Sequence, residues 1–323
     1  MAIIKIIPLK DTTVNSFIDV NKGIDEILGL GVQYTTKSVN RILIAFDTNY
    51  INNLDTIYSG SVTKYLNMYV ATANTLPSNY IIECYQLLDG NWNNGIGNST
   101  YNDTNGISWS SYISSYDTTK IKLLEKSCSI YDDKDIKLNV TNSTNYSYAI
   151  NIKNDINLAT GSTFNLNYFS KDTNTIYFPT IDYKFTDSVY TVPVSGSVVT
   201  KNSIVISLKN NTNQFYVDSN YRINIGVRDS YPDRLFLKTS IFSQKKYLPS
   251  TSYYCVRDIE AKYNLIEFDT NYTTISLDTN GNFFNLYTNN FETNRYYSID
   301  LKVIVNGSEQ IYKDLYHFKI SDK

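Results

Sequence analysis

One local pattern repeats along the whole chain and limits what it can fold into. Short runs rich in Ile, Val, Tyr, Phe and Thr alternate with clusters of Asn, Asp, Ser and Gly; clear examples of the runs are residues 41–47, 63–70 and 80–88. β-Branched and aromatic residues suit a pleated surface, whereas Asn, Asp, Ser and Gly suit turns. Regular spacing of such runs is typical of sandwiches and barrels, so the sequence predicts an all-β fold.

The composition points the same way. The chain has 30 Tyr and 14 Phe but only 2 Trp, 2 Met and 1 His. Ala and Glu, which favour helices, are sparse. A single short segment, residues 23–29, has a helix-like pattern, but a glycine at each end makes a strand or bulge an equal alternative. We therefore predict no substantial helix.

A length of 323 residues suits two domains. Pro193 and Gly196 punctuate a stretch between strand-like runs, which places the predicted domains at 1–187 and 188–323. The predicted fold is a β-sandwich followed by an immunoglobulin-like β-sandwich. In the second domain, Asn280-Gly281 and Asn306-Gly307 each lie between apolar runs and predict hairpins with type I′ turns.

The net charge and the N-terminal residues argue against several functions. The net charge of −2 and the pI of about 5.5 lack the basic excess of a nucleic-acid-binding surface. The sequence has no basic amphipathic helix of the kind that binds a membrane surface, so we expect no membrane partner. The first residues, MAIIKIIPLKDTT, lack the pattern of a secretion signal, so we expect synthesis in a cytoplasm.

Little in the chain could form a reactive centre. The single histidine, His317, is expected to be an ordinary strand residue, and Cys84, Cys128 and Cys255 are expected to be buried free thiols. Residues 278–282 resemble the start of a calcium loop, but Asn289 stands where the closing acid should be, so a hairpin is preferred. We predict no catalytic residue, no cofactor and no metal, although sequence alone leaves open a glycosidase with two facing carboxylates.

Residues 89–118 differ from the rest, because they are rich in Gly, Asn and Ser and contain both tryptophans. Long loops of this kind often carry binding residues. Trp92, Trp109 and Tyr112 are therefore candidate anchors for a partner protein. The alternative interpretation is that the tryptophans fix the loop to the sandwich.

Several motifs, taken in order, resemble a family of tailed-bacteriophage virion proteins that has an N-terminal DNRLRE-type β-sandwich. The matching segments are residues 8–14 (PLKDTTV), 21–28 (NKGIDEIL), 41–47 (RILIAFD), 92–97 (WNNGIG), 106–109 (GISW), 168–179 (YFSKDTNTIYFP), 253–258 (YYCVRD), 278–287 (DTNGNFFNLY) and 295–299 (RYYSI). The region 137–166 lacks the family's usual Trp and Gly-Phe pattern. The resemblance covers most of the chain and implies a jelly-roll β-sandwich for residues 1–187.

This resemblance implies a structural protein of a virion, made in the cytoplasm of the host bacterium. It implies other virion proteins as partners, at the neck, collar, tail or fibre-attachment region, with no nucleic acid and no membrane. A symmetric particle implies several copies, whose contacts are homotypic or with other proteins. The alternative is a carbohydrate-binding module on the host surface, recognisable by exposed aromatic rings over a groove.

Overall fold

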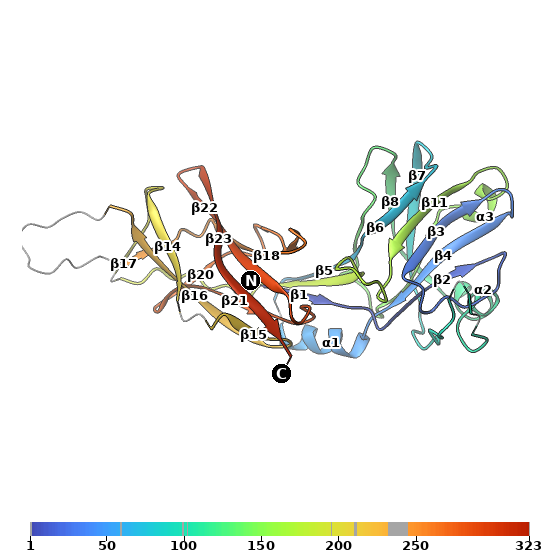
Figure 1. The fold of residues 1–323 in the computed structure, drawn as a ribbon, viewed down its shortest axis with the longest axis horizontal. Coiled ribbons are helices and arrows are strands. Elements are labelled where there is room, and N and C mark those ends of the chain that lie inside the picture. Colours follow the sequence, from blue (N-terminus) through green and yellow to red (C-terminus); the bar gives the residue numbers. More distant parts are fainter. Residues whose placement is uncertain are drawn as a thin grey trace, which may run out of the picture. The chain divides into compact units, whose positions relative to one another are not determined.

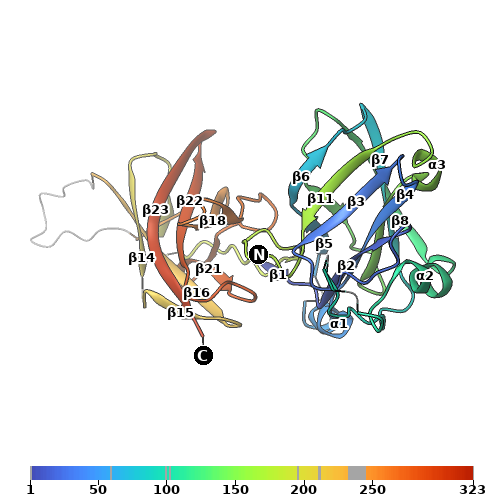
Figure 2. The ribbon, with the colours of Figure 1, turned by 45° about the vertical axis from the view of Figure 1, so that its right-hand side comes forward.

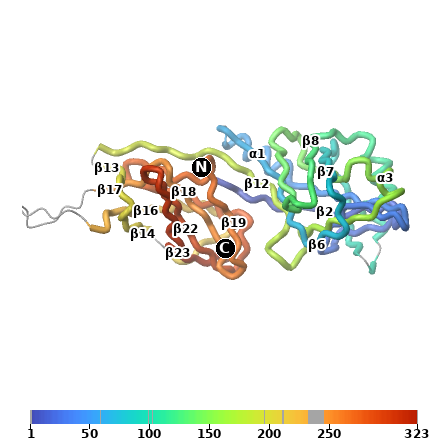
Figure 3. Tube along the Cα trace, turned by 90° about the horizontal axis from the view of Figure 1, so that it is seen from above, coloured from blue at the N-terminus to red at the C-terminus, as the bar shows by residue number. Residues whose placement is uncertain are grey.

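The computed structural model describes residues 2–58, 60–98, 100–101, 103–194, 196–209, 212–231 and 245–322. Strands dominate these residues, and helices are few and short (Figure 1). The predicted all-β class is confirmed. Figure 3 follows the chain from its blue N-terminal strands to the red strands β22 and β23.

The chain divides into two compact units. The N-terminal unit comprises Lys5–Ser59 and Thr63–Tyr183, and the C-terminal unit comprises Met1–Ile4, Gly60–Val62 and Lys184–Lys323. The division at Lys184 falls close to the predicted boundary after residue 187. Nothing in the sequence indicates that Met1–Ile4 and Gly60–Val62 group with the C-terminal unit.

The main sheet of the N-terminal unit is eight-stranded, with the order β6-β11-β3-β4-β10-β7-β8 and with β2 paired to β4 (Figure 2). The strands are β2 (Lys10–Asn15), β3 (Ile27–Gln33), β4 (Ser38–Ala45), β6 (Val70–Asn74), β7 (Asn79–Gln86), β8 (Ile121–Ser129), β10 (Ser147–Ile152) and β11 (Phe164–Phe169). A four-stranded sheet has the order β1 (Ala2–Ile6), β12 (Thr180–Phe185), β5 (Val62–Met68) and β9 (Ile136–Asn139).

The central strands β4 and β10 are buried on both faces of the main sheet. Every residue of β10 is buried, and so is every residue of β4 except Asn40. On one face, Phe46 meets Tyr148 edge to face with ring centroids 6.5 Å apart. The other face carries a second cluster, called here the outer cluster: Val14, Leu43, Ala45, Leu87, Trp92, Ile107, Tyr112 and Ala149. Because Trp92, Ile107 and Tyr112 come from residues 89–118, that segment covers the outer face of the sheet.

The helical segments in the described residues are α1 (Thr48–Ile57), α2 (Trp109–Tyr112), the π-helical turn η1 (Ile113–Asp117) and α3 (Asp155–Leu158). The sequence pattern predicts none of them. Asp47 caps the N-terminus of α1, and its carboxylate accepts a hydrogen bond from the Tyr50 amide at 3.0 Å. Ile51 and Leu54 lie buried on one side of it. Their i, i+3 spacing is the signal that sequence reading missed, because the surrounding Asn and Thr residues disfavour helix.

The C-terminal unit is a β-sandwich of two main sheets. One has the order β14 (Ile204–Lys209), β16 (Asn220–Asp229), β21 (Gly281–Tyr287) and β20 (Ser276–Asp278). The other has the order β15 (Gln214–Tyr216), β23 (Ser308–Ser321), β22 (Tyr296–Val305), β18 (Ser252–Asp258) and β19 (Asn264–Ile266). A short parallel pair joins β13 (Gly196–Val198) to β17 (Lys245–Tyr247).

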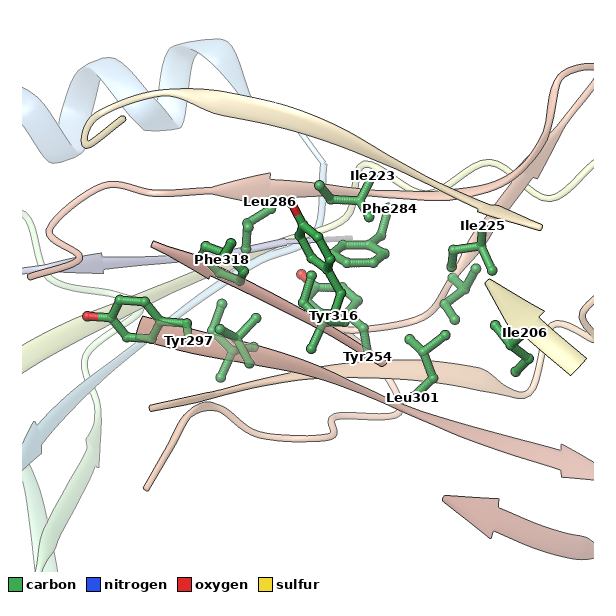
Figure 4. Packing of buried hydrophobic residues seen from close by; sticks show 14 of the residues in the cluster. Ile206, Ile223, Ile225, Tyr254, Phe284, Leu286, Tyr297, Leu301, Tyr316 and Phe318 are labelled. Carbon is green, nitrogen blue, oxygen red and sulfur yellow. The ribbon is translucent and has the colours of Figure 1, made fainter. Parts of the chain in front are cut away.

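Both sheets contribute to one hydrophobic core (Figure 4). Tyr254 of β18 stacks on Phe284 of β21 with ring centroids 4.1 Å apart, which ties one sheet directly to the other. Burial of large aromatic rings stabilises this core, and a stacked pair adds about 1 kcal/mol to it.

The two predicted hairpins form, but with different turns. Asn306 and Gly307 both have positive φ, at 51° and 80°, and Val305 pairs with Ser308, so this turn is type I′ as predicted. At the other hairpin, Asp278 pairs with Gly281, and only Gly281 has positive φ. That turn is therefore not type I′. The Asp278 carboxylate accepts from the Asn280 and Gly281 amides at 2.8 and 3.2 Å, so it caps a turn and does not begin a calcium loop.

One buried carboxyl on β2 makes the fold sensitive to pH. Asp11 is 1% exposed; one oxygen accepts from the Lys171 amide at 2.7 Å, and the other has no hydrogen-bond partner. Burial raises the pKa of Asp11 to about 7, against the opposing effect of the Lys171 amide and ammonium. Folding therefore favours the protonated acid.

We predict that Asp11→Asn stabilises the protein at pH 8. In the parent, the stabilisation linked to protonated Asp11 is complete below about pH 4 and is lost as pH rises through about 7. The full difference is about 4 kcal/mol, since one pKa unit is worth about 1.4 kcal/mol. Urea unfolding from pH 4 to pH 8 measures it.

Asp258→Asn is the opposite-sign control. Burial raises the pKa of Asp258, but the hydrogen bonds from Arg295 and from the Ala261 amide, together with the Arg295 charge, outweigh burial and lower it. That variant should be less stable than the parent at pH 8. The interpretation of Asp11 is wrong if Asp11→Asn gives no gain at pH 8, or if the gain persists unchanged at pH 4.

Candidate interaction surface

Residues 89–118 are held on the main sheet by Trp92. Its ring is 2% exposed, and its indole N–H donates to the Ser147 hydroxyl of β10 at 3.1 Å. The Lys10 ammonium lies 4.9 Å from the ring centroid and donates to the carbonyls of Gly90 and Trp92 at 2.7 and 2.5 Å. Lys10 thus fixes the backbone at the start of the segment, on both sides of Asn91.

Arg41 of β4 holds the other end of the segment. Its guanidinium makes two hydrogen bonds to Asp155, at 2.7 and 3.0 Å, and one to Asp117 at 2.9 Å. The same guanidinium lies 4.9 Å from the Trp109 ring centroid. Burial lowers the pKa of Arg41, but the hydrogen bonds to Asp155, together with the negative charges of Asp155 and Asp117, outweigh burial and raise the pKa. Arg41 therefore stays charged although it is 4% exposed.

The three predicted anchors are largely buried by these contacts. Trp92 and Tyr112 are 2% and 0% exposed, so in this structure they offer no surface to a partner. Both belong to the outer cluster, and the Tyr112 hydroxyl donates to Asp117 at 2.8 Å. Trp109 is half-buried beside Arg41. The geometry agrees with the alternative interpretation, in which these rings fix the loop to the sandwich.

The centre of the loop region is Asn21, a residue that sequence reading did not single out. It is 0% exposed. Its amide donates to the carbonyls of Asn94 and Ile107 at 2.7 and 3.0 Å, and its oxygen accepts from the amides of Gly23 and Gly97 at 3.2 and 2.9 Å. One side chain therefore joins three stretches of backbone.

The glycines of this region make room for Asn21. A Cβ on Gly106 would lie 2.2 Å from the Asn21 Cγ, and one on Gly97 would lie 2.3 Å from its carbonyl oxygen. A Cβ on Gly95 would lie 2.4 Å from the Asn21 Oδ1. Glycine is thus required at these positions of the motifs 92–97 and 106–109, because Asn21 packs too closely against them to leave room for a Cβ.

The two chain segments that carry Asn21 and its partner Gly97 also carry exposed apolar side chains. We call them the loop surface: Phe17 (62% exposed), Ile18 (51%), Ile24 (42%), Ile27 (38%), Ile96 (61%) and Tyr101 (56%). The Asn15 carboxamide accepts from the amides of Phe17 and Ile18, both at 2.8 Å, and so fixes that turn. The Ile24 amide donates to the Gly97 carbonyl at 3.0 Å, which links the two segments that carry the surface.

The rim of the loop surface is acidic. A shallow depression of about 500 Å³ is lined by Ile24, Asp25, Glu26, Ile27, Asn98 and Thr100. Apolar groups beside carboxylates match a partner that presents an apolar side chain next to Lys or Arg.

The other candidate residues have structural roles or none. Cys84, Cys128 and Cys255 are free and buried as predicted, and burial raises the pKa of Cys84 and Cys255 to about 12. His317 lies on β23, 55% exposed, with its Nε2 3.4 Å from Asp314 Oδ1. Within the described ranges no group of three His, Cys, Asp or Glu side chains is placed to hold a metal ion. Among the same residues, no helix is long and apolar enough to cross a bilayer.

Comparison with known proteins gives no family. No family model matches the chain, and no curated protein matches it. A DUF4785 family protein from Legionella pneumophila aligns over 96% of this chain and 66% of its own, with 8% identity and a TM-score of 0.22. A β-glucuronidase from Bacteroides uniformis aligns over 87% of this chain and 26% of its own, with 8% identity and a TM-score of 0.18.

A tripod protein from the baseplate of bacteriophage Tuc2009 aligns over 98% of this chain and 92% of its own, with 11% identity and a TM-score of 0.19. Scores of this size carry no functional argument. The resemblance to a phage virion family therefore stays a prediction from the motifs.

We predict that Asn21→Ala destabilises the N-terminal unit by about 3 kcal/mol or more. The change removes four hydrogen bonds, each worth about 1 kcal/mol, and leaves buried backbone groups unpaired. Residues 89–118 should then become sensitive to protease. Urea unfolding and limited proteolysis followed by mass spectrometry measure both effects.

Asn93→Ala is the matched control, because Asn93 is exposed in the same loop and its amide also donates to a backbone carbonyl, that of Asn105 at 2.8 Å. It should cost less than about 1 kcal/mol. Equal costs for the two variants would contradict a central role for Asn21.

Proposed function

We propose that the chain is a non-catalytic structural protein of a tailed-phage particle, where it binds other particle proteins at the neck, collar, tail or fibre-attachment region. In this proposal the N-terminal unit is the DNRLRE-like jelly roll of the virion family, and the C-terminal unit is immunoglobulin-like. The order of the sequence motifs and the all-β architecture support it.

The observation that carries the proposal is the loop surface. Six large apolar side chains are 38–62% exposed on two segments that Asn21 and a short hydrogen-bond network hold in place. Such a surface is already ordered before binding, so a partner loses little conformational entropy in the loops when it docks. Clustered exposed apolar groups mark interaction sites.

The partner is a protein of the particle that presents an apolar side chain beside Lys or Arg. The apolar part fits Ile24, Ile27 and Ile96, and the basic group fits the Asp25 and Glu26 rim. Attraction between the acidic rim and this basic group raises the association rate more than the final affinity.

We predict that Ile96→Ser and Tyr101→Ser each weaken incorporation into particles at least tenfold without loss of stability. Loss of an apolar anchor costs binding energy, whereas surface substitutions rarely change stability by more than about 0.5 kcal/mol. Mass spectrometry of purified particles of the encoding phage measures copy number, and circular dichroism checks folding.

The matched controls are Ile156→Ser and Tyr131→Ser, which remove equally exposed or more exposed side chains (60% and 94%) elsewhere on the N-terminal unit. They should incorporate normally. Absence of the parent protein from purified particles would refute the placement in the virion. Equal loss for test and control variants would refute the loop surface.

A further inference from the structure

A second feature of the N-terminal unit has a different character from the loop surface. It is an open polar groove of about 620 Å³. Its lining comes from the start of β2, the β4–α1 turn, the segment after β7, and residues 144–147: Leu9, Lys10, Ala45, Phe46, Asp47, Thr48, Asn49, Gln86, Leu88, Asp89, Gly90, Asn91, Thr144, Asn145 and Ser147. Ligand sites are commonly of this size.

One part of the lining, called here the floor of the groove, is held in place by hydrogen bonds. The Gln86 amide donates to the Thr144 hydroxyl at 2.8 Å, and its oxygen accepts from the Thr144 amide at 3.1 Å. The Asn145 amide donates to the carbonyls of Leu87 and Leu88 at 3.1 and 3.0 Å, and its oxygen accepts from the Thr48 hydroxyl at 3.0 Å. A floor built this way has a fixed shape before any ligand arrives.

The rim keeps polar groups available for a ligand. Asp47 and Asp89 each use Oδ1 to accept a backbone amide, from Tyr50 at 3.0 Å and from Asn91 at 2.8 Å, so each carboxylate is oriented and has Oδ2 left over. The side chains of Asn49 and Asn91 are exposed and make no hydrogen bond within the described residues. The rim thus combines free acceptors and donors at fixed positions.

The charges exclude several ligand classes. The groove contains one lysine and two aspartates, and both Lys10 hydrogen bonds within it go to backbone carbonyls. Phosphate, sulfate or nucleic acid would meet two carboxylates and a single ammonium, which already donates to two backbone carbonyls. A hydroxyl group, in contrast, can donate to a carboxylate and accept from a carboxamide at once.

We propose that this groove binds a neutral polyhydroxylated ligand, that is, a glycan. Hydroxyls would pair with Asp47, Asn49, Asp89 and Asn91, and the apolar face of a sugar ring would lie against Leu88, which is 55% exposed. The one aromatic residue in the lining is Phe46, which is 4% exposed. The groove therefore differs from the row of exposed aromatic rings expected of a carbohydrate-binding module, and recognition rests on hydrogen bonds.

The test is a printed array of bacterial surface oligosaccharides, followed by saturation-transfer NMR of the full chain with each oligosaccharide that binds. Asn49→Ala and Asn91→Ala should each weaken binding about tenfold, since each loses a hydrogen bond to the ligand worth about 1.4 kcal/mol. The matched control is Asn53→Ala, exposed on the same helix but outside the lining. It should bind as the parent does.

Three results would overturn the proposal: no binding to any oligosaccharide on the array, binding restricted to sulfated or phosphorylated glycans, or binding that survives the Asn49→Ala/Asn91→Ala double variant. The groove shares no residue with the loop surface. Loss of glycan binding with normal incorporation into particles, or the reverse, therefore separates this inference from the proposed function.

Discussion

Burial of β4 on both faces is the constraint on which the N-terminal unit depends. A strand with apolar residues on both sides must be covered twice, and one cover here is a loop and not a second sheet. The Trp92 indole bonded to Ser147, and Arg41 bonded to Asp155 and Asp117, attach that cover. Arg41 is itself costly to bury, and removing both carboxylates would leave its charge desolvated and unpaired. Loss of these attachments would therefore disrupt both the outer cluster and the loop surface.

Much of the strand pattern could be predicted, because strand propensity and turn chemistry agree over most of the chain. The predicted run 41–47 contains the last five residues of β4 and the two residues that follow it. The helix α1 was missed because Asn and Thr dominate its exposed side, and only Ile51 and Leu54 mark its buried one. The turn at Asn280-Gly281 was predicted as type I′ from two residues, but the carboxylate of Asp278 stabilises another turn by capping it. The local dipeptide does not contain that information.

The candidate site was harder to predict, for a physical reason. Tryptophans are natural candidates for interface anchors. A large ring stabilises the fold most when it is buried, however, and Trp92 is buried beneath its own loop. Asn21 is one of many asparagines, and its partners, the carbonyls of Asn94 and Ile107, are distant in the sequence. No periodicity or spacing shows such a contact. The glycines of 92–97 and 106–109 did mark the region, but their reason is visible only with Asn21 in place.

The way Asn21 holds the loops has an evolutionary consequence. It contacts main-chain carbonyls and amides and the bare Cα atoms of glycines, so it does not depend on which side chains the loops display. Phe17, Ile96 and Tyr101 can therefore change in size, polarity or charge while the loops keep their course. Partner choice and foldability are then separate traits. A lineage whose partners diverge can follow them through single substitutions, and selection need not restore the fold after each one.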